Sequence, residues 1–225
     1  MKEQTPQLIM FDLDGTLIDS APDIAIAGNT MLTQLGRNNF EPTHFRHWVG
    51  NGATVMVNRA LSGSDQVDPN LCPELSKKAL DIFMKAYLAA PCVATTLYDG
   101  VTDTLKTLKD KGKTIAVVTN KPAAFITPIL TTLDIAKYVD FQLGGDELPQ
   151  KKPDPAPLLH TCKALGFDAQ NAIMIGDSTN DIQAAHNAGI TSIGLTYGYN
   201  YGKPINGDNP NHVFERFEDI LNVIS

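Results

Sequence analysis

The sequence has few cysteines and no long apolar run. Its three cysteines, Cys72, Cys92 and Cys162, lie far apart and form no C-x-x-C pair, so a disulfide framework is excluded and we expect reduced thiols. The apolar run at 8–11 stops at Asp12, which is too short for the core of a signal peptide. No run approaches the roughly 20 apolar residues of a membrane helix. We therefore expect a cytoplasmic protein that does not bind membranes.

Positive charge is also scarce. The chain has 18 lysine and arginine residues against 25 aspartate and glutamate residues, for a formal net charge of -7. Non-specific binding to nucleic acid or to an anionic membrane needs dense lysine and arginine, so we expect neither partner. Hydrophobic residues make up 43% of the 225 positions. This composition is sufficient for a packed core, in one large domain or in one domain with an insert.

Short apolar runs alternate with helical patterns along most of the chain. Four runs bounded by turn residues predict buried strands, and a fifth run is fainter. Apolar residues at helical spacing lie between them, and proline or glycine marks the expected helix ends. This alternation predicts an α/β fold, a Rossmann-like parallel sheet with helices on both faces. Strands are expected at 8–11, 114–119, 139–143, 172–175 and 190–195, and helices around 101–108, 122–133, 155–165 and 182–188.

The stretch 20–90 breaks the alternation. It carries apolar residues at helical spacing, such as Ile24, Met31, Leu75 and Phe83, and no clear strand. We therefore predict a core formed by residues 1–19 and 91–225, with an inserted helical cap domain at 20–90. The segments 14–20 and 91–100 would connect the two.

Polar clusters directly follow the predicted strands. In open α/β sheets, ligands bind beyond the carboxyl ends of the strands, so clusters that are distant in sequence are expected to converge there. The four clusters are Asp12-Leu13-Asp14-Gly15-Thr16, Thr119-Asn120-Lys121, Lys151-Lys152-Pro153 and Gly176-Asp177-Ser178 with Asp181.

The clusters suit phosphoryl chemistry around a divalent cation. Crowded carboxylates raise one another's pKa, and a hard cation such as Mg²⁺ relieves that repulsion through oxygen ligands. Asp12, Asp14 and Asp177 are a plausible set of ligands. A lysine and a threonine could neutralise a phosphoryl group. Of two nearby aspartates, one can act as nucleophile and the other as acid and base.

Each cluster alone also has an ordinary structural explanation. Aspartate and glycine favour turns, Thr119-Asn120 could cap a helix, and Lys151-Lys152 could be an exposed pair. The occurrence of all four clusters, each after a predicted strand, favours a common site.

In this order the clusters resemble the motifs of the haloacid dehalogenase-like phosphohydrolases, over essentially the whole chain. The resemblance implies Mg²⁺ and a phosphoaspartyl intermediate. The presence of Asp14 favours phosphate esters over carbon–halogen chemistry. Carried over by motif, this resemblance implies that Asp12 is both the nucleophile and a metal ligand, and that Asp14 is the acid and base and gives its backbone carbonyl to the metal. It further implies that Asp177 ligates the metal and that Asp181 supports it. The implied phosphate-binding residues are Thr119, Asn120 and Lys152.

A glycine-flanked turn in the predicted cap is the candidate for substrate recognition. Gly50, Asn51 and Gly52 precede a helical pattern at 55–61. A helix start with free N–H groups suits a second anion, such as a carboxylate, although an ordinary turn between helices would look the same.

The run W-V-G-N-G-A is similar to bacterial phosphoglycolate phosphatases, which implies 2-phosphoglycolate as the small phosphate ester. A phosphosugar mutase or sugar phosphatase and a receiver-like phosphoacceptor module are the alternatives. The sequence predicts no oligomeric state.

Overall fold

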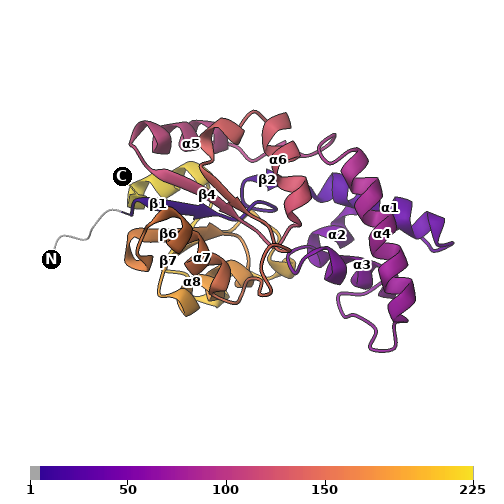
Figure 1. Cartoon of the computed structure of the whole chain (residues 1–225). Helices are drawn as coiled ribbons and strands as arrows, with labels where there is room; N and C mark the ends of the chain where they lie inside the picture. Colours follow the sequence, from indigo (N-terminus) through magenta and orange to yellow (C-terminus); the bar gives the residue numbers. More distant parts are fainter. Residues whose placement is uncertain (1–5, 225) are drawn as a thin grey trace.

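The computed structural model describes residues 6–224 and is built on a six-stranded parallel sheet, most of whose strands are labelled in Figure 1. The strand order is β5-β4-β1-β6-β7-β8, and every neighbouring pair runs parallel. This confirms the predicted sheet, whose five expected strands all form. Residues 1–5 and 225 of the predicted core lie outside the described residues. The strands are β1 Leu8–Phe11, β4 Thr114–Val118, β5 Phe141–Leu143, β6 Ala172–Gly176, β7 Thr191–Leu195 and β8 His212–Phe214.

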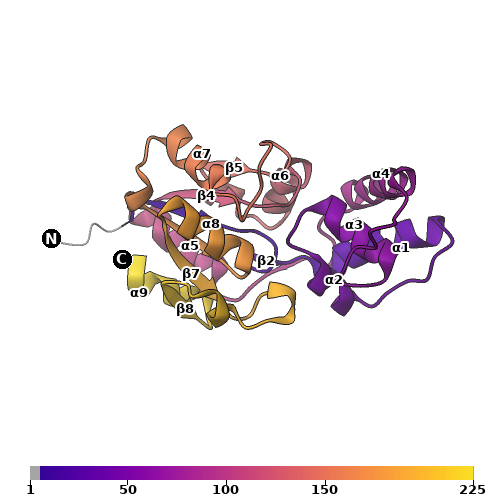
Figure 2. The same cartoon turned by 90° about the horizontal axis from the view of Figure 1, so that it is seen from below.

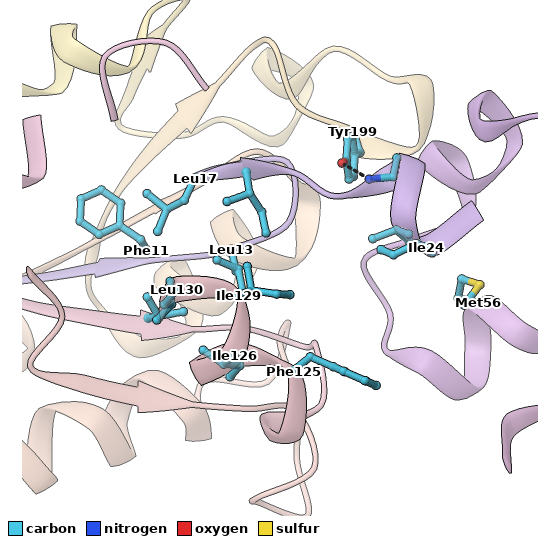
Figure 3. Packing of buried hydrophobic residues seen from close by; sticks show 14 of the residues in the cluster. Phe11, Leu13, Leu17, Ile24, Met56, Phe125, Ile126, Ile129, Leu130 and Tyr199 are labelled. Atoms are coloured by element: carbon cyan, nitrogen blue, oxygen red, sulfur yellow. Dashed lines mark hydrogen bonds between the residues drawn. The ribbon is translucent and has the colours of Figure 1, made fainter. Parts of the chain in front are cut away.

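Both faces of the sheet are buried. Successive residues of a strand point to opposite faces, so one strand contributes side chains to two apolar clusters. In β1, Ile9 and Phe11 join one apolar cluster, and Leu8 and Met10 join another. Helices α5 and α6 contribute to the first cluster, where residues of α6 lie near Phe11 (Figure 3), and α7 and α8 contribute to the second. The helices are α5 Val101–Asp110, α6 Ala123–Thr132, α7 Ala156–Leu165, α8 Thr179–Ala188 and α9 Leu221–Ile224.

Residues between β2 and β3 form a separate lobe of four helices, which Figure 2 shows beside the sheet. Helix α1 packs against the other three. No strand forms within 20–90, as predicted, but the two connecting segments pair as an antiparallel ribbon that the sequence did not reveal. The bounds are α1 Ala21–Gln34, α2 Pro42–Trp48, α3 Ala53–Ser62, α4 Pro73–Ala89, β2 Ile18–Asp19 and β3 Thr96–Leu97.

Short elements complete the fold. Strand β8 pairs with β7 at the edge of the sheet; its three exposed or half-buried residues form no apolar run, so the sequence analysis missed it. Within residues 6–224, no helix has both the length and the apolar character needed to cross a membrane. The 3-10 helices are η1 Ala136–Tyr138, η2 Ala169–Asn171, η3 Asn200–Gly202, η4 Ile205–Asp208 and η5 Phe217–Ile220.

A buried carboxylate ties the start of the lobe to its return segment. Asp23, in the first turn of α1, accepts hydrogen bonds from the backbone N–H groups of Val93, Ala94 and Thr95 and from the Thr95 hydroxyl. Replacing Asp23 with alanine leaves these donors unpaired. We expect the free energy of unfolding to fall by about 3 kcal/mol, because hydrogen bonds to charged groups are worth about 1.5–3 kcal/mol each and do not add fully. Urea denaturation measures the loss.

The same contacts give this stabilisation a pH dependence. Burial alone would raise the pKa of Asp23, but its hydrogen-bond donors lower that pKa below the ordinary 3.8. The contribution is therefore complete above the unfolded pKa and is lost as the pH falls through the folded pKa. Between pH 7 and pH 3 we expect the difference in unfolding free energy between wild type and Asp23→Ala to shrink. A constant difference would contradict this account.

Candidate active site

The first aspartate motif forms a tight turn at the carboxyl end of β1. The Asp12 amide still donates to the carbonyl of Ile175 in β6, at 3.0 Å, and the Gly15 amide closes the turn onto the carbonyl of Ile18, at 2.8 Å. Gly15 has φ +85°, and a Cβ there would lie 2.4 Å from Asp177 Oδ2. The glycine therefore lets the turn reach the loop after β6, which brings the first and fourth motifs together.

Three carboxylates meet at this junction. One oxygen from each of Asp12, Asp177 and Asp181 lies within 4.8 Å of the others. Asp177 is oriented by Thr16, whose hydroxyl donates to Oδ1 at 2.7 Å, and by the Tyr199 amide, which donates to Oδ2 at 2.7 Å. The junction therefore concentrates negative charge where the sequence predicted a metal.

Burial and the neighbouring carboxylates raise the pKa values of Asp177 and Asp12. Burial, followed by Asp181 and Asp12, raises the pKa of Asp177 from 3.8 to about 8. Burial, together with Asp181 and Asp14 and against the opposing effect of Lys152, raises the pKa of Asp12 to about 6. Both shifts favour the neutral acids. A cation bound between these oxygens would reverse that preference.

Lys152 lies against the carboxylates. Its Nζ donates to Asp181 Oδ1 and to the carbonyl of Val118, both at 2.6 Å, and lies 3.0 Å from Asp12 Oδ1. Burial alone would lower the pKa of Lys152, but Asp12 and Asp181 raise it above its ordinary value. Lys152 is therefore a buried, charged cation beside Asp12, and its contact with phosphate stays a prediction. Lys151 is half-buried and does not line the cavity described below.

Asn120 connects the loops around the site. Its Nδ2 donates to the carbonyls of Lys152, at 2.9 Å, and Gly50, at 2.8 Å, and its Oδ1 accepts from the Lys152 amide. The side chain therefore positions the lysine loop and the turn before α3. Thr119 is buried, and its hydroxyl oxygen accepts from the Lys121 amide at 3.2 Å. Neither residue caps helix α6, because Pro122 directly precedes that helix.

Asp14 lies apart from the three carboxylates and contacts Lys121 instead. Lys121 Nζ donates to Asp14 Oδ1 and to the Tyr87 hydroxyl, both at 2.8 Å. The Ser20 hydroxyl also donates to Asp14. The sequence analysis assigned no role to Lys121, although it belongs to the Thr119-Asn120-Lys121 cluster, and no signal in the sequence pointed to Tyr87 in α4.

The turn before α3 reaches into the core. The Gly50 carbonyl accepts from Asn120 and from Asn180 Nδ2, at 2.8 and 3.0 Å. Gly50 and Gly52 have positive φ values of 119° and 87°, which side chains disfavour, and both line the cavity described next. Asn51, the third predicted residue of this turn, does not line it.

One cavity collects most of the predicted residues. It measures about 40 Å³, on a scale where one water needs about 10–15 Å³. Asp177 does not line it, although it lies beside Asp12 and Asp181, which do. On the side of the helical lobe the wall is apolar, and Phe125 of the core faces the same side, toward Ile24 and Met56 (Figure 3). The predicted residues that line it are Asp12, Asp14, Thr119, Asn120, Lys152, Asp181, Gly50 and Gly52.

Comparison with known proteins places this geometry in context. The model of the family described as haloacid dehalogenase-like hydrolase matches residues 9–195. A protein of Colwellia psychrerythraea, named phosphoglycolate phosphatase, is 49% identical over 221 residues, which are 98% of each chain. A protein of the same name from Pseudomonas putida is 47% identical over 96% of this chain and 79% of its own length.

A solved structure has a similar fold over almost its whole length. The fold is similar to a crystal structure from Haemophilus somnus, described as a predicted phosphoglycolate phosphatase, with a TM-score of 0.92 and 39% identity over 99% of both chains.

Proposed function

The chain belongs to the haloacid dehalogenase-like hydrolase family, and on that basis we propose that it hydrolyses 2-phosphoglycolate to glycolate and phosphate, as a cytoplasmic, Mg²⁺-dependent enzyme. The observation that carries the proposal is the cluster of Asp12, Asp177, Asp181 and Lys152, of which Asp12, Asp181 and Lys152 line one cavity. The names of the full-length relatives support the choice of substrate. We also propose that 20–90 is a cap domain on a core of 1–19 and 91–225.

The acidic cluster fits a magnesium ion. Mg²⁺ prefers oxygen ligands and commonly uses one or two carboxylates, with water and substrate phosphate completing its coordination. Asp12, Asp177 and the backbone carbonyl of Asp14 would hold it, and Asp181 would support it. The raised pKa values of Asp12 and Asp177 are those of ligands that a cation would stabilise in the charged form. When bound, the ion neutralises charge on the phosphoryl oxygens.

The side chains then divide the reaction into two steps. An oxygen of Asp12 attacks phosphorus, forming a phosphoaspartate as the ester P–O bond breaks and Asp14 gives a proton to the leaving oxygen. Asp14 then takes a proton from a water molecule that attacks the phosphoaspartate, which releases phosphate and restores Asp12. Throughout, the Lys152 ammonium and the Thr119 hydroxyl stabilise the phosphoryl oxygens, and Asn120 acts through the loops that it holds.

The wall of the cavity favours a substrate without a sugar. The lining residues from the helical lobe are mostly apolar and carry no charge, so they offer few hydrogen-bond partners to sugar hydroxyls. This wall favours a small ester over the phosphosugar of a mutase. The whole helical lobe sets the chain apart from a receiver-like phosphoacceptor module, which needs no such insert.

A phosphate-release assay tests the proposal. With Mg²⁺ present, we expect release of inorganic phosphate from 2-phosphoglycolate with a kcat/KM at least about tenfold above that for glucose 1-phosphate or glucose 6-phosphate. Conversion of one glucose phosphate into the other without free phosphate would favour the mutase. A stable phosphoprotein that releases no phosphate would favour the phosphoacceptor.

A further inference from the structure

Lys121 is a buried cation that the reaction steps above do not use. Its side chain is buried and lines the cavity, and its Nζ donates to two acceptors, Asp14 Oδ1 and the Tyr87 hydroxyl. An ammonium group has three donors, so one N–H of Lys121 is left for a further acceptor. The ammonium group forms an ion pair with Asp14 Oδ1 at 2.8 Å, and lysine is protonated at neutral pH at its ordinary pKa, so the group carries a positive charge.

The rest of the cavity shows where this charge acts. Its lining contains two cations, Lys121 and Lys152. Lys152 is committed to Asp12, Asp181 and a backbone carbonyl, at the end where phosphoryl transfer is proposed. Lys121 lies beside Asp14, the residue that would protonate the leaving oxygen. The lining residues of the helical lobe carry no charge and are Ile24, Val49, Gly50, Gly52, Ala53, Met56, Phe83 and Tyr87.

We propose that Lys121 and the hydroxyl of Tyr87 form a binding site for a carboxylate on the leaving group, and that this pair selects short phosphate esters with a carboxylate. The inference rests on the proposed phosphatase function and deepens it. The Tyr87 hydroxyl accepts from Lys121, so its own proton remains for a second acceptor. A carboxylate that takes one hydrogen bond from each group satisfies both donors within an otherwise apolar wall.

The pair also links recognition to the position of the helical lobe. Lys121 belongs to the loop after β4, whereas Tyr87 belongs to α4. The carboxylate site is complete only when α4 lies against that loop. A substrate with a carboxylate therefore favours this arrangement, whereas a phosphate ester without a carboxylate gains nothing from it.

Two esters of equal chain length separate selectivity from general catalysis. In 2-phosphoglycolate a carboxylate stands where ethyl phosphate has a methyl group. We expect Lys121→Gln to lower the ratio of kcat/KM for 2-phosphoglycolate to kcat/KM for ethyl phosphate by about 10- to 100-fold, mainly through KM, because hydrogen bonds to charged groups are worth about 1.5–3 kcal/mol. Lys85→Gln, an exposed charge on α4, is the matched control and should leave the ratio unchanged.

The outcomes are distinct. An unchanged ratio in Lys121→Gln, whatever the loss of overall rate, would overturn the carboxylate site, because a residue that only positions Asp14 slows both esters equally. If Lys121→Gln does not fold, Tyr87→Phe decides, since it removes one hydroxyl and keeps the ion pair. A lowered ratio there supports the site, and an unchanged ratio overturns it. A wild type that hydrolyses neither ester would overturn the proposed function, and this inference with it.

Discussion

Asp12→Asn will lower phosphate release from 2-phosphoglycolate by at least about 10⁴-fold, because an amide oxygen cannot form the phosphoaspartate and loss of a nucleophile removes most of a covalent mechanism. A large loss of rate is possible, since hydrolysis of phosphate monoesters is among the slowest uncatalysed reactions and the enzyme's rate enhancement is correspondingly large. Steady-state phosphate release measures the rate. Acid-quenched protein should carry labelled phosphate in wild type and none in the variant.

The fold should survive this change. Burial and neighbouring acids raise the pKa of Asp12, so the charged side chain is a cost in the metal-free protein, and asparagine removes that charge at similar volume. We expect a melting temperature at or above that of wild type at pH 8. Asp110→Asn, an exposed position at the end of α5, is the control and should retain full activity. Turnover by Asp12→Asn at the wild-type rate would remove Asp12 from its proposed role.

Chelation of divalent ions with EDTA will abolish turnover, and added Mg²⁺ will restore it. Without the cation, the substrate's phosphoryl charge meets Asp12, Asp177 and Asp181, and Lys152 alone does not balance these three carboxylates. We expect a loss of at least about 10³-fold in kcat, since metal ions supply several kcal/mol of charge stabilisation in such reactions. Full activity in EDTA would contradict the metal assignment.

Stability supplies a second measurement of the same site. Folding raises the pKa of Asp12 and Asp177 from 3.8 to about 6 and about 8, so the metal-free protein loses stability as the pH rises from about 4 through these folded values. Magnesium binds the charged carboxylates. Its stabilising effect on the melting temperature should therefore increase from pH 5 to pH 9. An effect that is equal at both pH values would argue against binding at these residues.

The sequence was sufficient for the parts of the fold that depend on local pattern. Buried parallel strands are continuous apolar runs, so 8–11 and 172–175 were found nearly to the residue. Two motifs follow those strands directly, which is why Asp12 and Asp177 could be expected at one edge of the sheet. Lys152 comes nine residues after β5, in the loop that leads to α7. The helical lobe was predictable because strand patterns cease between 20 and 90.

Features that depend on tertiary contacts were beyond the sequence. The ribbon of β2 and β3 has two residues per strand, too few for any periodicity. Tyr87 follows the ordinary pattern of an apolar helix face, and only the approach of α4 to the loop after β4 gives its hydroxyl a polar partner. Asn120 was expected at the phosphate, but its amide holds two backbone carbonyls, a role that needs the positions of three loops.

The ribbon also bears on how substrate enters. Two independent single-stranded crossings would let the helical lobe slide, twist and swing. Pairing of β2 with β3 joins the two crossings into one two-stranded connection, and the hydrogen bonds of Asp23 hold the start of α1 against the β3 side of it. Such a connection bends more easily than its two strands slide past each other. We therefore expect the lobe to rotate about one hinge axis and to return to the same position after each turnover, with the Gly50 carbonyl again at Asn120 and Asn180.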